Sequence, residues 1–380
     1  MSDLLPTLRA ALSGDGPALL PHPAKKEPPS ALGPGLPLAE DEDNPHDPTV
    51  AVVSTSGSTG TPKGALLPAS ALLASASATH DRLGGAGRWL LALPAHHVAG
   101  LQVLLRSLIS GTVPAVLDLS EGFRAEAFAE AARSVTGGRL RAYTSLVPTQ
   151  LGRLLDAGPD VVSSLTGFAA VLLGGAPAPR SLLARAADAG VRVVTTYGSS
   201  ETCGGCVYDG RPLDGTRIRV DEDGRIRLGG PTVARGYRGG DVVGAFSTDA
   251  GARWFRTDDA GHLDADGTLT FLARLDDMIV TGGLKVAPAV VEEALLAVEG
   301  VAEAVVVGVT DPVWGQRVVA AVVPARGRRP PTLDDLRREV TRRAGPHAAP
   351  RQLLVLERLP LRGPGKPDRT GIAKLASRSI

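Results

Sequence analysis

Residues 49–64 have the sequence TVAVVSTSGSTGTPKG, and this stretch decides the fold class of the chain. Its first half is a run of apolar and β-branched residues, which predicts a buried strand. Its second half places hydroxyl side chains, glycines and Lys63 in one loop, and residues 69–84 then have the composition of a helix. A strand, a glycine-rich loop and a helix in this order indicate an α/β fold.

The alternation of apolar strands and helices continues on the C-terminal side of this stretch. Strands are predicted at residues 88–94, 113–119, 142–148, 169–175 and 192–198, and helices at residues 100–111, 125–135 and 180–190. Such alternation is typical of a sheet with crossover helices. From about residue 205 to residue 273, short segments between Gly and Asp turns predict a β-meander or a small β-barrel-like subdomain.

The pattern changes again after residue 274. Two helices are predicted at residues 287–298 and 332–344, and three strands at residues 301–309, 316–325 and 351–360. We therefore predict a large N-terminal α/β domain, residues 1–274, with the small β-rich subdomain inside it, and a smaller C-terminal α+β domain, residues 275–380.

The composition narrows the class of function. The 380 residues include 41 basic and 40 acidic side chains, so the net charge of +1 gives no support for a nucleic-acid partner. The first residues lack the basic flank and apolar run of a signal peptide, and no apolar stretch has the length of a membrane span. We expect a cytoplasmic protein that does not insert into membranes.

Cysteine and lysine are both rare in this chain. The two cysteines, Cys203 and Cys206, have C-x-x-C spacing, but no second Cys or His pair lies nearby, so two small residues in a Gly-rich loop are favoured over a metal or redox site. Only six of the 41 basic residues are lysines, and Lys63, Lys285 and Lys366 lie in or beside glycine-rich turns. Because a compact ammonium differs chemically from a guanidinium, these lysines are candidates for function.

The loop of residues 54–64 is suited to phosphate, yet it is not a Walker A motif. That motif requires G-x-x-x-x-G-K-[ST], whereas here Pro62 follows Gly57 by five residues and Gly64 follows Lys63. Pro62 also removes a backbone N–H that a phosphate nest would use. A phosphate-binding loop of another type is the functional interpretation, and a polar Gly-rich turn between the strand and the helix is the alternative.

Three later segments add groups that suit a nucleotide and a metal. TTYGSSETCGG, residues 195–205, holds hydroxyls with the carboxylate of Glu201, a reasonable ligand for Mg²⁺. Asp259 and Arg274 each end a strand-like piece, and an aspartate in such a place can accept from both hydroxyls of a ribose. Lys366 lies in a Pro- and Gly-rich loop, from which it could neutralise phosphoryl charge. Each has a plain alternative, as a solvated turn or surface residue.

In this order the motifs resemble those of the adenylate-forming superfamily of acyl-CoA ligases. They are TSGSTGTPKG, LPAHHVAG, LLGGAP, YGSSET, RTDDAG, RLDDMIVTGG and GPGKPDR, and they span residues of about 50 to 372. ASATHDRLGG, HVAGLQVLLRSL, RAYTSLVPTQL and GGCVYDGRPLDGTRIRV resemble more narrowly the o-succinylbenzoate–CoA ligase branch of that superfamily, in its short actinobacterial form. The branch acts in menaquinone biosynthesis.

The resemblance implies ATP-dependent formation of an acyl-adenylate, followed by transfer of the acyl group to CoA, with ATP, Mg²⁺ and CoA as cofactor and co-substrates. It implies that the C-terminal domain rotates at a hinge, so that adenylate formation and transfer to CoA use different orientations of that domain. The implied roles are phosphate binding by Thr55, Ser56, Gly57, Ser58, Thr59, Gly60 and Lys63; an adenine pocket of Gly174, Gly175, Ala176, Thr196, Tyr197 and Gly198; contact with the α-phosphate by Ser200 or Thr202; ribose binding by Asp259 with Arg274 beside it; Mg²⁺ binding by Glu201; a hinge at Asp276; catalysis of adenylation by Lys366; and an acyl-pocket gate at His97.

Two departures from the superfamily pattern concern the ribose site and the N-terminus. The superfamily commonly has R-T-G-D where this chain has Arg256-Thr257-Asp258-Asp259, and we place the ribose role on Asp259 by its offset. The chain is also shorter than most relatives before the first motif, so part of the N-terminal subdomain is expected to be reduced. The oligomeric state stays open between monomer and homodimer.

Substrate choice depends on Arg106, which lies nine residues after His97 on an apolar segment. We predict that Arg106 pairs with a second carboxylate of the acid, as an aromatic keto-diacid such as o-succinylbenzoate requires; a structural or surface arginine is the alternative. Another acyl- or aryl-CoA ligase, or a free-standing adenylating enzyme, remains open. Lys366, Glu201 and Asp259 disfavour an inactive nucleotide-binding protein, and the failed Walker pattern disfavours a P-loop ATPase.

Overall fold

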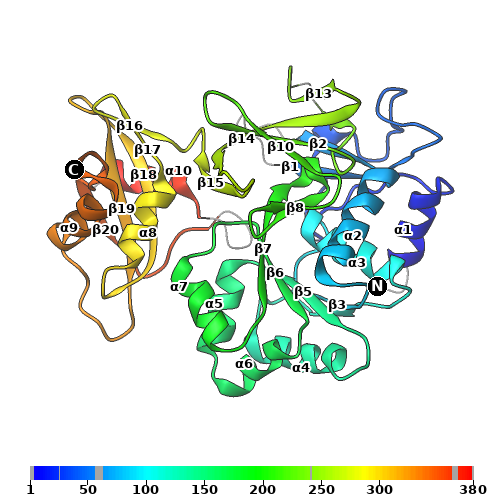
Figure 1. Cartoon of the computed structure of the whole chain (residues 1–380), viewed down its shortest axis with the longest axis horizontal. Helices are drawn as coiled ribbons and strands as arrows, with labels where there is room; N and C mark the ends of the chain where they lie inside the picture. The colour runs from blue at the N-terminus through cyan, green and yellow to red at the C-terminus, as the bar shows by residue number, and fades with distance from the viewer. Residues whose placement is uncertain (1–3, 25, 56–62, 240–241, 362–366, 379–380) are drawn as a thin grey trace.

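The computed structural model describes residues 4–24, 26–55, 63–239, 242–361 and 367–378. Figure 1 shows a large body, coloured from blue to green, and a smaller lobe of yellow to red elements at the left of the view. The chain begins in the large body with helix α1 (Leu4–Ser13) and ends in the small lobe. The structure therefore has the mixed α/β architecture predicted from the sequence.

A seven-stranded sheet forms the centre of the large body. Its strand order is β4 (Ala115–Val116), β3 (Arg88–Leu91), β5 (Ala142–Leu146), β6 (Ala170–Leu173), β7 (Val193–Ser199), β8 (Gly204–Tyr208) and β9 (Arg211–Pro212). The pairs from β4 to β7 are parallel, and β8 and β9 are added antiparallel. The predicted crossover sheet is confirmed.

Helices cover both faces of this sheet. Because successive strand residues point to opposite faces, Trp89 and Leu91 pack in one apolar cluster while Leu90 packs in another. The helices of the first cluster are α1, α2 (Ala69–Leu83) and α3 (Val98–Ile109). Those of the second are α4 (Ala125–Thr136), α5 (Pro148–Asp156), α6 (Pro159–Thr166) and α7 (Arg180–Asp188). Buried strands on both faces explain the continuous apolar runs in the sequence.

Two antiparallel sheets complete the large body. A three-stranded sheet has the order β1 (Thr49–Thr55), β2 (Lys63–Pro68) and β12 (Gly236–Arg238). A five-stranded sheet has the order β10 (Arg217–Val220), β11 (Arg225–Gly229), β14 (Ala252–Leu263) and β13 (Phe246–Asp249), with β15 (Leu269–Arg274) also paired to β14. Short 3₁₀ helices are present at η1 (Ser30–Leu32) and η2 (Ser200–Thr202). The short strands predicted between residues 205 and 273 belong mostly to the five-stranded sheet.

The small lobe is built on a separate sheet. Its strands are β16 (Ile279–Thr281), β17 (Leu284–Val286), β18 (Val301–Asp311), β19 (Gly315–Pro324) and β20 (Gln352–Val355), and its helices are α8 (Pro288–Leu296), α9 (Leu333–Ala344), η3 (Pro346–Ala348) and α10 (Arg369–Arg378). The predicted pair of strands is the long antiparallel pair β18–β19, and β20 joins β19 in parallel. The chain passes from β15 of one sheet to β16 of the next through residues 275–278.

Some elements differ from those predicted from the sequence. The strand predicted at residues 142–148 ends at Leu146, because Pro148 begins helix α5. Strand β2, which the sequence analysis did not predict, is almost wholly buried between β1 and β12. Among the helices of the described ranges, none combines the length and hydrophobicity of a membrane span.

Candidate active site

The phosphate-type loop connects two paired strands. Strand β1 ends at Thr55 and β2 begins at Lys63, and these two residues face each other in the antiparallel register. The Thr55 hydroxyl donates to the Lys63 carbonyl oxygen at 3.3 Å. Five residues predicted to bind phosphate lie outside the described residues: Ser56, Gly57, Ser58, Thr59 and Gly60. The described ends of the loop are therefore held together by the sheet.

Lys63 and Glu201 both lie beside Tyr237, a residue that was not predicted from the sequence. The Tyr237 hydroxyl donates to Glu201 Oε1 at 2.7 Å, and the Lys63 ammonium lies 5.9 Å from the centroid of the same ring. Burial and the Glu201 carboxylate raise the pKa of Tyr237, which keeps this donor protonated. The pairing of β12 with β2 brings these residues together, so a cation, a phenol and a buried carboxylate lie beside the loop.

The two hydroxyl candidates beside Glu201 differ in how their side chains are used. Thr202 is fully buried, and its hydroxyl contacts the Ser199 backbone and donates to the Gly204 carbonyl oxygen at 2.8 Å. Ser200 is only partly buried. Of the two predicted α-phosphate contacts, the structure thus leaves Ser200 the more accessible, while Thr202 braces the turn that carries Glu201.

The predicted adenine pocket lies at the carboxyl ends of two neighbouring parallel strands. Gly174, Gly175 and Ala176 follow β6, and Thr196, Tyr197 and Gly198 lie on β7. A Cβ atom at Gly174 would stand 2.3 Å from Thr196 Oγ1, so a side chain here would disrupt the contact between the two strands. Carboxyl ends of parallel strands are the usual place of ligand crevices in α/β sheets.

Asp259 lies beside the predicted adenine pocket. The Tyr197 hydroxyl donates to Asp259 Oδ2 at 2.8 Å, and Asp259 faces Arg274 across the β14–β15 pair, with Nη1 and Oδ1 3.6 Å apart. Burial raises the pKa of Asp259, while the hydrogen bond from Tyr197 and the charge of Arg274 oppose that rise. The side chain is 17% exposed, so a largely dry carboxylate is held next to the nucleoside wall.

Arg274 joins three carboxylates at the passage between the two sheets. It forms a bidentate pair with Asp276, at 2.9 and 3.0 Å, and lies 3.7 Å from Asp258. Burial disfavours the Arg274 cation, but the three aspartates outweigh it and raise its pKa. Asp258, the departure from the superfamily motif, is paired mainly with Arg225 at 3.1 Å. Asp258 thus has its own partner, which leaves Asp259 as the carboxylate next to Tyr197.

His97 stands immediately before helix α3, at the position of its N-cap. The rings of His96 and His97 are 4.4 Å apart, and burial lowers the pKa of His96. A Cβ atom at Gly100 would lie 2.3 Å from the Pro94 carbonyl oxygen, so glycine is needed for the loop to pack on the first helical turn. The motif PAHHVAG therefore places both histidine rings at one end of α3.

Arg106 is near the other end of α3 and is only 3% exposed. Its Nη2 donates to the Tyr208 hydroxyl at 3.4 Å, its guanidinium lies 5.0 Å from the centroid of Trp89, and its Nε has no hydrogen-bond partner. Burial lowers the pKa of Arg106, yet a guanidinium stays charged at neutral pH. Within the described part of the chain no carboxylate forms an ion pair with it. The surface-arginine alternative is wrong.

Lys366 lies outside the described residues, but the two ends of its loop do not. Leu361 and Pro367 form a β-bridge, and the Asp368 N–H donates to the Pro360 carbonyl oxygen at 2.8 Å. Arg369 then binds Glu292 at 2.6 Å and lies 3.3 Å from Asp277, which follows the predicted hinge residue. The base of the lysine loop is thus tied to helix α8 of the small lobe and to residues 275–278.

Cys203 and Cys206 are buried free thiols, and burial raises the pKa of Cys206 to about 12, so it is a protonated and weak nucleophile. No cluster of metal-type ligands occurs among the residues that the structure describes.

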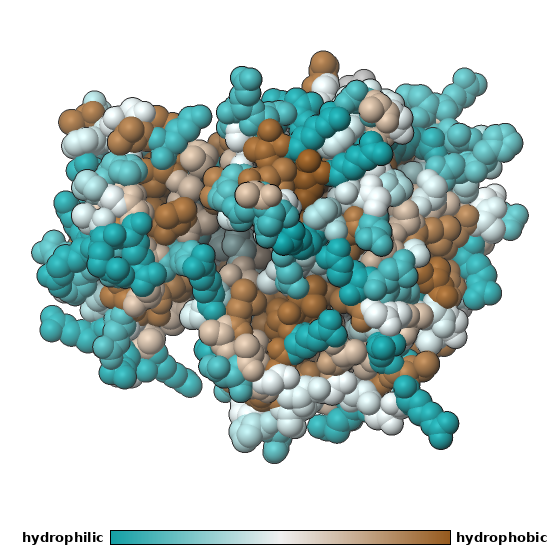
Figure 2. All heavy atoms as spheres, in the orientation of Figure 1, coloured by the Kyte–Doolittle hydropathy of each residue, from teal (hydrophilic) through white to brown (hydrophobic). Residues whose placement is uncertain are grey.

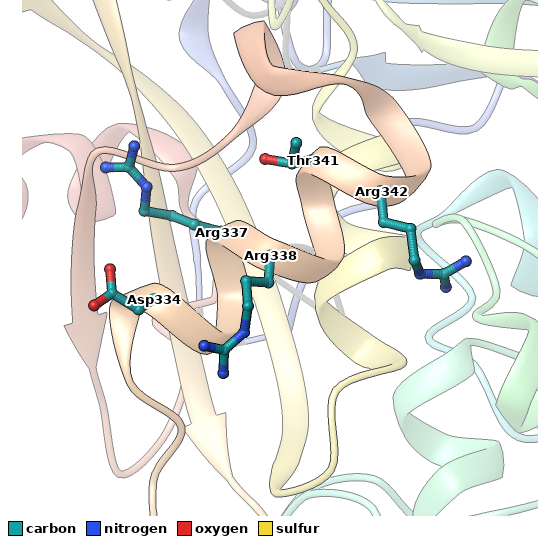
Figure 3. A pocket seen from close by; sticks show the side chains of 5 residues that line it. All are labelled: Asp334, Arg337, Arg338, Thr341 and Arg342. Atoms are coloured by element: carbon teal, nitrogen blue, oxygen red, sulfur yellow. The ribbon is translucent and has the colours of Figure 1, made fainter.

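A surface hollow lies on α9, in the hydrophilic part of the small lobe seen at the left of Figure 2. Its volume is about 550 Å³, and it is lined by Asp334, Arg337, Arg338, Thr341 and Arg342. Figure 3 shows that the three guanidinium groups point away from one another. Arg342 is also neutralised by Glu339 at 2.6 Å. None of the predicted site residues lines this hollow.

Comparison with protein families supports the two-part organisation of the motifs. The model for "AMP-binding enzyme" matches residues 7–238, and the model for "AMP-binding enzyme C-terminal domain" matches residues 290–366. Tyr237 lies at the end of the first match, and α8, which carries Glu292, begins close to the start of the second.

Relatives with curated functions are similar over most of their length. A probable 2-succinylbenzoate–CoA ligase from Mycobacterium tuberculosis is 49% identical over 373 residues, covering 98% of this chain and 94% of that protein. The 2-succinylbenzoate–CoA ligase from Bacillus licheniformis is 34% identical over 347 residues, covering 85% of this chain and 70% of that protein.

Solved structures of the same kind share the fold. The o-succinylbenzoate CoA synthetase from Bacillus subtilis, in complex with the acyl-adenylate intermediate OSB-AMP, has a TM-score of 0.73 and 31% identity, covering 86% of this chain and 69% of that chain. The same synthetase in complex with ATP and magnesium ion has a TM-score of 0.72 and 30% identity, covering 85% of this chain and 70% of that chain.

Proposed function

The chain belongs to the AMP-binding enzyme family, and from this we propose that it activates 2-succinylbenzoate with ATP and transfers the acyl group to CoA. The family membership makes it an AMP-forming acid–thiol ligase. The particular acid is our proposal, and the sequence resemblance places this step in menaquinone biosynthesis. Another aryl- or acyl-CoA ligase is the alternative.

The chemistry requires two steps because a carboxylate has no good leaving group. A carboxylate oxygen of the acid attacks the α-phosphorus of ATP, the α–β phosphoanhydride bond breaks, and pyrophosphate leaves with the bond electrons. The thiolate of CoA then attacks the acyl carbon, and AMP leaves. The first step brings one anion to another, so it depends on cations and hydrogen-bond donors placed around the phosphates.

The proposed nucleotide site follows the order of the described groups. Thr55 and Lys63 flank the loop proposed to hold the β- and γ-phosphates, with Ser200 at the α-phosphate. Gly174 and Tyr197 are proposed to form part of the wall of the adenine pocket. Asp259 accepts from both ribose hydroxyls. Its hydrogen bond from Tyr197 and its pairing with Arg274 support this role, because they hold the carboxylate in place and oppose the rise in its pKa that burial causes.

Glu201 suits a magnesium ion. It is a carboxylate in a buried position, it is held by Tyr237 at one oxygen only, and oxygen ligands are those that Mg²⁺ prefers. When bound, the ion supplies positive charge that offsets the charge of the phosphates. Glu201 would hold the ion, and Tyr237 would orient the carboxylate toward the loop that begins after Thr55.

The catalytic lysine and the moving domain remain proposals from the sequence. We place the division between residues 274 and 275, the hinge at Asp276 and the adenylation role on Lys366. The passage between two separate sheets at residues 275–278 supports a hinge there. The bidentate pair between Arg274 and Asp276 would hold one orientation, and rotation would exchange the residues that face the α-phosphate and the acyl carbon.

The observation that carries the choice of acid is the buried charge of Arg106. Burying a cation without a partner costs several kcal/mol, so such a group is retained where a ligand supplies the opposite charge. 2-Succinylbenzoate has two carboxylates: one is activated, and the other is available to pair with Arg106. A monocarboxylic acid would leave this cation uncompensated. His97, at the other end of α3, is proposed to gate the acyl pocket.

A panel of acids tests the proposal. The purified chain is incubated with Mg²⁺, ATP and CoA and one of four acids: 2-succinylbenzoate; 4-oxo-4-phenylbutanoate, which lacks only the ring carboxylate; benzoate; or a fatty acid. We expect acid-dependent pyrophosphate release with 2-succinylbenzoate, and a kcat/KM lower by about 30-fold or more for the matched monoacid. Release with the other acids but not with 2-succinylbenzoate would reject this substrate and favour the alternative ligase.

A further inference from the structure

Arg106 is held by groups that carry no charge. Thr79 Oγ1 donates to the Ser75 carbonyl oxygen at 2.8 Å, so in its 2.9 Å contact with the Tyr208 hydroxyl it acts as the acceptor. Tyr208 therefore gives its proton to Thr79 and turns a lone pair toward Arg106 Nη2. The proton order of this chain of hydroxyls is fixed by the helix backbone, and it presents a neutral oxygen to the guanidinium.

The aromatic residues beside Arg106, Trp89 and His80, are also uncharged. Trp89 lies against the guanidinium, and its Nε1–H donates to His80 Nε2 at 3.2 Å. His80 Nε2 is thus an acceptor, and the ring carries its proton on Nδ1. Burial and the charge of Arg106 lower the pKa of His80 to about 4, so the ring is neutral at physiological pH. Trp89 and His80 orient Arg106 and do not neutralise it.

The face of α3 that carries Arg106 also carries Gln102, at the i, i+4 spacing. Gln102 lies one turn earlier, is fully buried, and donates from Nε2 to the Cys203 carbonyl oxygen at 2.8 Å. Its Oε1 and the Arg106 Nε are two buried polar atoms without a hydrogen-bond partner. Asp81, the acid nearest to His80 in the sequence, is exposed. The two described groups that the Arg106 guanidinium contacts, the Tyr208 hydroxyl and the Trp89 ring, are both neutral.

We propose that His80, Trp89, Tyr208 and Gln102 form a neutral cage that makes the enzyme selective for dicarboxylic acids by withholding a counter-ion from Arg106. The cage residues are positioning residues. Tyr208 and Trp89 contact the guanidinium, His80 accepts from Trp89, and Gln102 lies one helical turn from Arg106. None of them carries a charge that would compete with the second carboxylate of the acid. The inference rests on the proposed function, and it adds that selectivity depends on the neutrality of these side chains as well as on the arginine.

The test supplies the missing counter-ion from within the protein. His80→Glu places a carboxylate near Arg106, and His80→Gln is the matched neutral control, which can still accept from Trp89 Nε1. Gln102→Glu is an independent second variant with nearly the same shape, and it forms a Glu–Arg pair at the i, i+4 spacing of α3. The readout is the ratio of adenylation kcat/KM values for 2-succinylbenzoate and 4-oxo-4-phenylbutanoate, with thermal unfolding recorded for each variant.

We expect the ratio to fall at least about tenfold in His80→Glu and Gln102→Glu, with the monoacid changed less than about threefold, because an internal ion pair competes with the substrate for Arg106. The ratio in His80→Gln should stay within about threefold of wild type. Tyr208→Phe should raise KM for the diacid about tenfold with little change in kcat or in the monoacid. A merely structural cage would lower activity on both acids alike.

Two outcomes separate the inference from its premise. A wild-type enzyme without preference for the diacid would reject the proposed substrate and the cage together. A wild-type preference that folded His80→Glu and folded Gln102→Glu both retain would overturn the cage alone. If one acidic variant fails to fold, the other decides the matter. Loss of preference in His80→Gln equal to that in His80→Glu would also overturn it, because charge would not be the cause.

Discussion

Replacing Asp259 by asparagine tests the ribose site with one atom changed. The side chain is 17% exposed, and the Tyr197 hydroxyl uses one oxygen at 2.8 Å. The remaining lone pairs are proposed to accept from both ribose hydroxyls as charge-assisted hydrogen bonds, each worth about 1.5 to 3 kcal/mol. Because the neutral amide keeps one acceptor oxygen, we expect a loss of about 2 to 4 kcal/mol, which is about 30- to 700-fold in kcat/KM for ATP.

The assay is acid-dependent exchange of pyrophosphate into ATP, carried out with ATP and with 2′-deoxy-ATP. Wild type should prefer ATP by about 10- to 100-fold, since the deoxy nucleotide loses one charge-assisted hydrogen bond. Asp259→Asn should reduce that preference to below about threefold, because the variant has already weakened the hydrogen bonds to the ribose hydroxyls. Asp258→Asn is the matched control: its carboxylate is paired with Arg225 at 3.1 Å, and we expect ATP preference within about threefold of wild type.

The reasoning would be refuted if Asp259→Asn discriminated ATP from 2′-deoxy-ATP as well as wild type does. It would also be refuted if Asp258→Asn lost the preference and Asp259→Asn kept it, because the ribose role would then belong to the neighbouring carboxylate.

Three further predictions concern other parts of the molecule. Glu201→Gln should lower the rate of adenylation and raise the Mg²⁺ concentration needed for half-maximal activity about 10- to 100-fold in a Mg²⁺ titration; an unchanged titration would remove Glu201 from the metal site. Burial and Arg106 lower the pKa of His80 from 6.5 to about 4, so as the pH falls the unfolded chain binds this proton before the folded chain does. The free energy of unfolding should therefore fall by up to about 3 kcal/mol as the pH drops from 6.5 toward 4. In denaturant unfolding, His80→Gln should depend less on pH than wild type, and an equal pH dependence of the two proteins would contradict this. Arg369→Gln breaks the pair with Glu292 near the loop of Lys366, so adenylation should slow about tenfold while thioester formation from supplied acyl-adenylate is unchanged; equal loss in both half-reactions would show a general structural role.

The alternating part of the fold was predictable because its physics is local. Parallel strands buried on both faces have continuous apolar sequences, and β6, with the sequence AVLL and every residue buried, follows this rule. Strand β2 was missed because its residues directly follow the phosphate-type loop, and its pairing depends on β12, far along the chain. Helix α5 was missed because it is short and begins at Pro148 immediately after a strand.

The site residues were predictable where a motif carries them, and their partners were not. Glu201 and Asp259 lie in recognisable segments, but Tyr237 reaches Glu201 only because β12 pairs with β2. A tyrosine in the Gly-rich segment ARGYRGG is the one sequence signal that could have drawn attention to it. Arg106 was predictable from the sequence because it is a single cation on an apolar segment.

The neutral surroundings of Arg106 could not be foreseen from the sequence. Trp89, His80 and Tyr208 come from three different elements, and only the packing of α2 and α3 on the central sheet brings them to the same place. Their separation along the chain leaves no local spacing that indicates a cluster.

One isotope measurement tests the central claim most directly. The chain is supplied with Mg²⁺, ATP, CoA and 2-succinylbenzoate labelled with oxygen-18 in the succinyl carboxylate. If the carboxylate attacks the α-phosphorus, one labelled oxygen passes to AMP as the thioester forms, and mass spectrometry will find AMP heavier by about two mass units and unlabelled pyrophosphate. Label in phosphate or pyrophosphate, or AMP without label, would contradict the proposed acyl-adenylate and the roles given to the residues around it.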